Sequence, residues 1–139
     1  MFAKRLSVDV LKVVLALVLM ASLVTPVSAA VSHSITFDHL EYYQVGGIWY
    51  SKWHYKVTSS GDPAISHVTI RLCVSCDDVT AGSSEFGAWE CGPDDKTGLT
   101  GIKWQLPGEE GVYYVWFELR GTQGVDWWQG WTDYGIKYG

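Results

Sequence analysis

Basic side chains are few in this sequence. Ten Lys and Arg stand against fifteen Asp and Glu in 139 residues, which gives a formal net charge of −5. Binding to nucleic acid depends on neutralising phosphates with Lys and Arg, and an acidic chain repels them instead. We therefore do not expect nucleic acid as a partner.

Long apolar runs are missing after the first thirty residues. Lys4 and Arg5 lie near the start of the chain, the apolar run 13–24 follows, and small residues up to Ala30 close the segment. This order is typical of a secretory signal peptide, here residues 1–30. The run is shorter than the about 20 residues of a membrane span, so we expect cleavage after Ala29 or Ala30, with an uncleaved anchor as the alternative. Residues 31–139 then form one secreted or cell-surface domain without a membrane span.

Helical periodicity is nearly absent from the rest of the chain. Apolar and polar residues alternate with a period of two at 49–58, 66–73 and 102–106, as half-buried strands require. The run 112–119 is apolar on both sides except for Glu118, which indicates a central strand. We expect an all-β fold, an antiparallel β-sandwich of about seven strands, Ig-like or jelly-roll-like. A partly closed barrel is the alternative.

Cysteine is limited to Cys73, Cys76 and Cys91. Disulfides form and persist outside the cytoplasm, so we expect Cys91 to pair with Cys76 or, alternatively, with Cys73, leaving one odd thiol. Zinc held by the three thiolates and His67 is a weaker alternative, because a second Cys-x-x-Cys pair is missing.

Two acidic pairs flank the cysteine loop and are a candidate calcium site. They are Asp77 with Asp78 and Asp94 with Asp95. A bridge between Cys76 and Cys91 would bring them together, and calcium takes oxygen ligands from such loops. Solvated turn residues are the alternative, and no other cofactor is expected.

Motifs for catalysis are also missing. The sequence holds neither a Gly-x-Ser-x-Gly elbow nor a His-Glu-x-x-His helix. We interpret His33, His39, His54 and His67 as surface or sheet-face residues. The chain is therefore expected not to be an enzyme, and a hydrolase that uses His67 with an acidic partner is the least favoured hypothesis.

Large aromatic rings, by contrast, are abundant. Eight Trp and eight Tyr all follow residue 30, which is more than one small core needs. On a continuous strand, Trp127 and Trp131 would project from one face about 13 Å apart. Such a pair can stack on sugar rings, with Gln129 and Asp133 as hydrogen-bond partners. Alternatively, Gly130 breaks the strand and the rings cover the end of the core.

Three stretches taken together resemble a known class of domain. They are 64–73 (AISHVTIRLC), 94–104 (DDKTGLTGIKW) with the aromatic strand after it, and 134–139 (YGIKYG). They are similar to small secreted β-sandwich domains of bacterial and archaeal exported and cell-surface proteins. The resemblance implies the fold and the location, with Ser66-His67 and 98–103 as marks of the fold, and it implies no activity. From the residues alone, Gly98 and Gly101 are expected to allow a turn with positive φ.

These observations predict a secreted, non-catalytic surface or adhesion module that recognises polysaccharide through exposed aromatic rings. The alternative is a structural or protein–protein assembly subunit of an extracellular matrix or filament, which contacts another protein through the same rings or through an open sheet edge.

Overall fold

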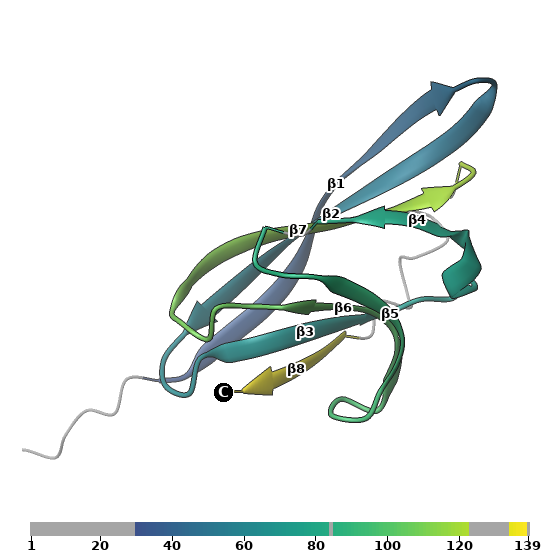
Figure 1. Ribbon diagram of the computed structural model, residues 1–139. Helices are drawn as coiled ribbons and strands as arrows, with labels where there is room; N and C mark the ends of the chain where they lie inside the picture. Colours follow the sequence, from purple (N-terminus) through teal and green to yellow (C-terminus); the bar gives the residue numbers. More distant parts are fainter. Residues whose placement is uncertain (1–29, 84, 123–133, 139) are drawn as a thin grey trace, which may run out of the picture.

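The computed structural model describes residues 30–83, 85–122 and 134–138 (Figure 1). The strands are β1 (Ser32–Val45), β2 (Ile48–Ser60), β3 (Ile65–Arg71), β4 (Val79–Gly82), β5 (Trp89–Asp94), β6 (Leu99–Gln105), β7 (Gly111–Arg120) and β8 (Tyr134–Tyr138), with a short 3-10 helix, η1 (Cys76–Asp78), before β4. In this described part of the chain, a helix with the length and apolar character of a membrane span is not found.

The strands form two antiparallel sheets of four, in the orders β1-β2-β7-β4 and β5-β6-β3-β8. This confirms the predicted all-β sandwich, with eight strands in place of about seven. The added strand is β4, a four-residue edge strand that the sequence does not distinguish from a loop. Phe86 lies in a turn, and β5 begins at Trp89.

The core lies between the two sheets and follows the predicted alternation. Every second residue of β2 and β7 faces inward, and β3 and β6 supply the opposite layer. Phe117 is fully buried at the centre, with its ring centroid 6.2 Å from that of Trp53, 6.0 Å from Tyr55 and 6.3 Å from Trp104. A fully buried aromatic ring contributes a large apolar area, so this cluster dominates the packing.

The β1–β2 hairpin extends beyond the sandwich as an arm, visible at the upper right of Figure 1. The two strands pair from Ser32 and Ser60 to Val45 and Ile48. Its two-residue turn, Gly46-Gly47, uses positive φ values of 58° and 82°, which glycine adopts at little steric cost. Strand β7 pairs with β2 only as far as Tyr50. Among the described residues, the part of the hairpin between Tyr50 and the turn has pairing only between β1 and β2.

The glycines of the β5–β6 hairpin have different roles. Gly98 has the expected positive φ of 72°, but the same expectation for Gly101 is wrong. A Cβ on Gly101 would overlap the carbonyl oxygen of Ile70 and come within 2.9 Å of the Cα of Arg71. Gly101 is therefore required because the backbones of β6 and β3 approach each other closely at this position.

The predicted disulfide between Cys76 and Cys91 is present, and it ties η1 to β5. Cys73 is free and exposed. The disulfide indicates a non-reducing compartment.

Replacing both bridged cysteines, as Cys76→Ser with Cys91→Ser, is expected to lower the free energy of unfolding by about 3 kcal/mol. The bridge closes a loop of 15 residues, and its loss restores the entropy of that loop in the unfolded chain. Chemical denaturation measures the difference. Cys73→Ser is the matched control, with an expected change within about 0.5 kcal/mol. An equal loss in the control would contradict the assignment.

Candidate functional site

The residues first predicted to bind sugar, Trp127, Trp131, Gln129 and Asp133, lie outside the described residues. Their role stays a prediction. The described residues instead place exposed aromatic rings on the outer surface of the β1-β2-β7-β4 sheet.

The register of this sheet decides which side chains point outward. Trp53, Tyr55 and Val57 of β2 face the core, so the alternate residues of β2 face solvent. Tyr43 of β1 lies opposite Tyr50 of β2 on the solvent side. Tyr114 and Trp116 of β7 lie on the same side, opposite Lys56 and His54. We call these four rings, with the polar side chains between them, the outer aromatic face.

Tyr43 is held in place at the arm end of the face. Its ring stacks on that of Tyr50, with centroids 5.4 Å apart, and its hydroxyl donates a hydrogen bond to Glu118. The hydroxyl of Thr80 donates to the other carboxylate oxygen of Glu118. The hydrogen bond to Glu118 raises the pKa of Tyr43 to about 12, so this phenol stays protonated at physiological pH. The ring is thereby ordered before any partner arrives.

The middle of the face combines rings with charge. The ammonium of Lys52 lies 3.9 Å from the ring centroid of Trp116, a cation–π contact. Tyr114, two residues from Trp116 on the same strand, is 54% exposed. Neighbouring rings on one strand project about 7 Å apart, and the rows from Tyr114 to Tyr50 span about 20 Å. The face is thus long enough to contact an extended ligand.

Two histidines lie beside these rings. His39 and His54 are paired across β1 and β2 and stack with ring centroids 4.0 Å apart. The hydrogen bond with Asp38 raises the pKa of His39, whereas burial lowers the pKa of His54. Burial alone would raise the pKa of Glu41, but its contacts with the two rings lower it. Next to each other, the two imidazoles therefore differ in their tendency to carry charge.

The opposite sheet carries a buried polar cluster around Asp94. Its Oδ2 accepts hydrogen bonds from the hydroxyls of Thr69 (2.6 Å) and Thr97 (2.7 Å) and lies 3.1 Å from Nε2 of His67. Its Oδ1 accepts from the backbone N–H of Lys96 at 3.2 Å. Both Asp94 and His67 are 5% exposed. Asp94 thus fastens the β5–β6 hairpin onto β3, a role in holding the fold together.

This cluster bears on two expectations from the sequence. His67 lies on a sheet face and does have an acidic partner, Asp94, and both residues are buried. Both carboxylate oxygens of Asp94 already accept the hydrogen bonds described above. Asp77, Asp78 and Asp95 are exposed. Among the residues that the structure describes, these four carboxylates do not form a group close enough to share one ion. Calcium binding there stays a prediction without support from the geometry.

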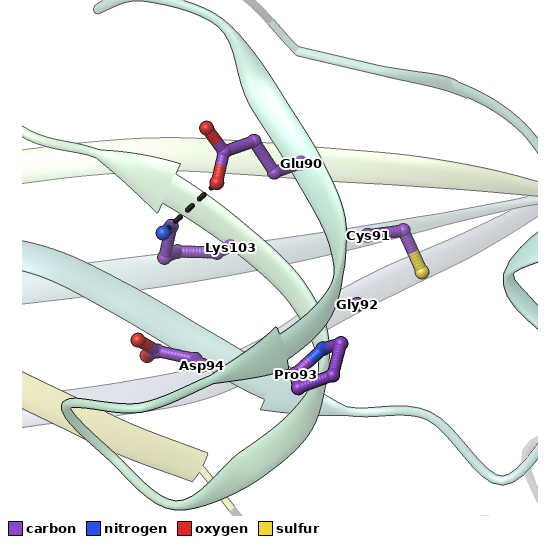
Figure 2. A pocket seen from close by; sticks show the side chains of 6 residues that line it. All are labelled: Glu90, Cys91, Gly92, Pro93, Asp94 and Lys103. Carbon is purple, nitrogen blue, oxygen red and sulfur yellow. Dashed lines mark ion pairs between the residues drawn. The ribbon is translucent and has the colours of Figure 1, made fainter.

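A pocket of about 330 Å³ lies along β5 and is lined by Glu90, Cys91, Gly92, Pro93, Asp94 and Lys103. Figure 2 shows the ion pair between Glu90 and Lys103, which joins neighbouring strands at 2.9 Å. This hydrogen-bonded pair raises the pKa of Lys103, which stays protonated. Because Cys91 is bridged and Lys103 is charged, the lining holds neither a free thiol nor a neutral amine.

The outer aromatic face was not recognised from the sequence. The bulge at Asp38 shifts the register of β1 between Phe37 and His39, so the side on which Tyr43 lies is not apparent from the sequence. Beyond the bulge, the odd-numbered residues of β1 lie on the solvent side of the sheet. Before it, the odd-numbered residues Ile35 and Phe37 lie on the side that faces the core. Pairing Tyr43 with Tyr50 about the turn Gly46-Gly47 is the signal that could have identified the face.

No protein-family model matches the chain, no curated protein is significantly similar to it, and no solved structure matches it significantly.

Proposed function

We propose that this chain is a secreted, non-catalytic binding module that recognises polysaccharide through the outer aromatic face. The observation that carries the proposal is that Tyr50 of β2 and Trp116 and Tyr114 of β7 lie on the same outward side of one sheet. Sugars present apolar C–H faces edged by hydroxyls, and rings flanked by polar groups complement both parts.

The surroundings of the rings support the same function. Lys52, Lys56 and Glu41 lie between or beside the rings on the solvent side and can hydrogen-bond to hydroxyls. The inner face of this sheet packs against the buried core, so the strands that carry the rings are rigid. Ordered rings lose little entropy on binding, which favours affinity. The disulfide is consistent with a protein that works outside the cell.

Removing two rings of the face, as Tyr50→Ala with Tyr114→Ala, is expected to weaken polysaccharide binding about tenfold or more. Each ring lost removes a stacking contact of about 1 kcal/mol, or about a fivefold change in affinity. Depletion of the protein from solution by insoluble polysaccharides such as cellulose and chitin measures the effect. Trp127→Ala with Trp131→Ala tests the segment first predicted from the sequence.

Tyr138→Ala is the matched control, because Tyr138 is 47% exposed but lies on β8 in the other sheet. It should bind as the unaltered chain does. If the unaltered chain is not retained by the polysaccharides, or if Tyr50→Ala with Tyr114→Ala binds equally well, the proposal is wrong.

Assembly with another protein is a second candidate, and the length of β1 favours it. This strand has 14 residues, and its outer edge has no strand partner among the described residues. An open edge is a template for adding a further strand. Size-exclusion chromatography with and without reductant is the test, and a monomer under both conditions at high concentration would exclude self-assembly.

A further inference from the structure

A β-bulge in β1 brings His39 and His54 together. Asp38 forms a bulge in β1, after which His39 pairs with His54 across the two strands. The two rings are nearly parallel, at an angle of 11°. Bulges commonly redirect a side chain next to a functional site, and this one places two imidazoles on one surface.

Glu41 completes a group of three ligand atoms. It follows His39 by two residues and therefore lies on the same face. One carboxylate oxygen is 3.4 Å from Nε2 of His39, and the other is 3.5 Å from Nε2 of His54. The three ligand atoms all lie within 4.8 Å of one another.

The distances of 3.4 and 3.5 Å from Glu41 to the two imidazoles are close to those between ligand atoms of a four-coordinate metal ion. Zinc binds imidazole nitrogen and carboxylate oxygen at about 2.0–2.2 Å, so neighbouring ligand atoms of a tetrahedron are about 3.4 Å apart. The Nε2 atom of His54 is itself buried and makes no hydrogen bond among the described residues. A buried nitrogen needs a partner, and a metal ion bound between this nitrogen and the neighbouring carboxylate would supply one.

Asp38 orients the first of these ligands. Its Oδ2 lies 2.8 Å from Nδ1 of His39, and a carboxylate accepts, so Nδ1 of His39 donates. The Nε2 atom is then the one that faces Glu41 and is available for a metal. A carboxylate that fixes the tautomer of a ligating histidine is the usual support of zinc sites.

We propose that His39, His54 and Glu41 bind a divalent transition-metal ion of the zinc class, with Asp38 as a positioning residue. Two imidazoles and one carboxylate suit zinc and its neighbours, whereas calcium and magnesium prefer oxygen ligands alone. Three protein ligands leave at least one coordination position open, and it faces solvent because the side chains of His39 and Glu41 are 49% and 53% exposed.

The test is zinc titration of the full mature chain by calorimetry, without a histidine tag. All measurements use the Cys73→Ser background, because the exposed thiol of Cys73 is itself a soft-metal ligand. The chain is expected to bind one zinc ion and to melt at a higher temperature when zinc is present. Cobalt replaces zinc in a parallel titration, in which a visible absorption band reports imidazole ligation.

Four variants and one control separate ligation from general surface effects. His39→Gln, His54→Gln and Glu41→Gln should each weaken zinc binding about tenfold or more and remove the thermal shift. Asp38→Asn keeps all three ligands and should still weaken binding about tenfold. His33→Gln on the same strand lies outside the group and should leave binding unchanged.

Two outcomes overturn the site. One is the absence of zinc binding to the Cys73→Ser chain, and the other is undiminished binding by His54→Gln or Glu41→Gln. Melting curves without zinc show whether each variant is folded, and Asp38→Asn provides a second measurement if a ligand variant is not. The inference does not depend on polysaccharide binding, because none of these measurements contains a sugar.

Discussion

Gly101→Ala is expected to lower the free energy of unfolding by at least about 4 kcal/mol, or to prevent folding. The added methyl group would meet the carbonyl group of Ile70 and the Cα of Arg71, which are backbone atoms of β3. A flexible side chain can move aside, but this backbone is held in the centre of the sheet by pairing with β6 and β8. Losses beyond about 4 kcal/mol are exceptional for a single methyl group and need such a cause.

Gly111→Ala is the matched control for this variant. Gly111 has an ordinary φ, and a Cβ there would meet only the end of the Tyr113 side chain, at 3.2 Å. Its expected effect is within about 1 kcal/mol. Urea or guanidinium denaturation followed by tryptophan fluorescence compares the two. If both variants are equally stable, the close approach of β6 to β3 is not as described.

Asp94→Ala is expected to lower the free energy of unfolding by about 3–5 kcal/mol at neutral pH. The substitution leaves the hydroxyls of Thr69 and Thr97 without their acceptor and leaves His67 buried without its partner. Removing one member of a buried, hydrogen-bonded pair carries a loss of this size. Asp95→Ala is the control, since Asp95 is exposed and its loss should change the stability by less than about 0.5 kcal/mol.

The same carboxylate predicts a dependence of stability on pH. Burial alone would raise the pKa of Asp94, but the hydrogen bonds from Thr69, Thr97 and Lys96, with His67 nearby, lower it well below its ordinary value of 3.8. A group with a lowered folded pKa stabilises fully above its unfolded pKa and loses that contribution as the pH falls further. The difference between the unaltered chain and Asp94→Ala should be constant above about pH 5 and shrink below 3.8. A difference that stays constant into strong acid would contradict the proposed role.

Alternation of apolar and polar residues was sufficient to predict the class of the fold. The inward residues of the run 112–119 form the centre of the core. Successive side chains of a strand point to opposite faces, so the alternation itself indicates which residues face inward. The pairing of Cys76 with Cys91 lay among the alternatives, but the choice against Cys73 depends on how η1 meets β5, which the sequence does not state.

The candidate surfaces were harder to predict because each depends on a departure from regular geometry. One extra residue at Asp38 changes which side of β1 faces solvent, and thereby brings His39 and Glu41 beside His54. The hydrogen bond between Thr69 and Asp94 likewise joins residues that lie 25 positions apart in the sequence. Local patterns carry no information about such contacts until the register and the curvature of the strands are known.

The length of β1 also fixes how far the arm stands from the ends of the domain. The strand runs from Ser32 to Val45, about 45 Å at the usual rise per residue. Near its beginning, the ring of His33 lies 5.1 Å from that of Tyr138 on the last strand, so both ends of the described chain meet at one pole (Figure 1). The first and last described residues thus lie at the opposite end of the molecule from the tip of the hairpin (Figure 1).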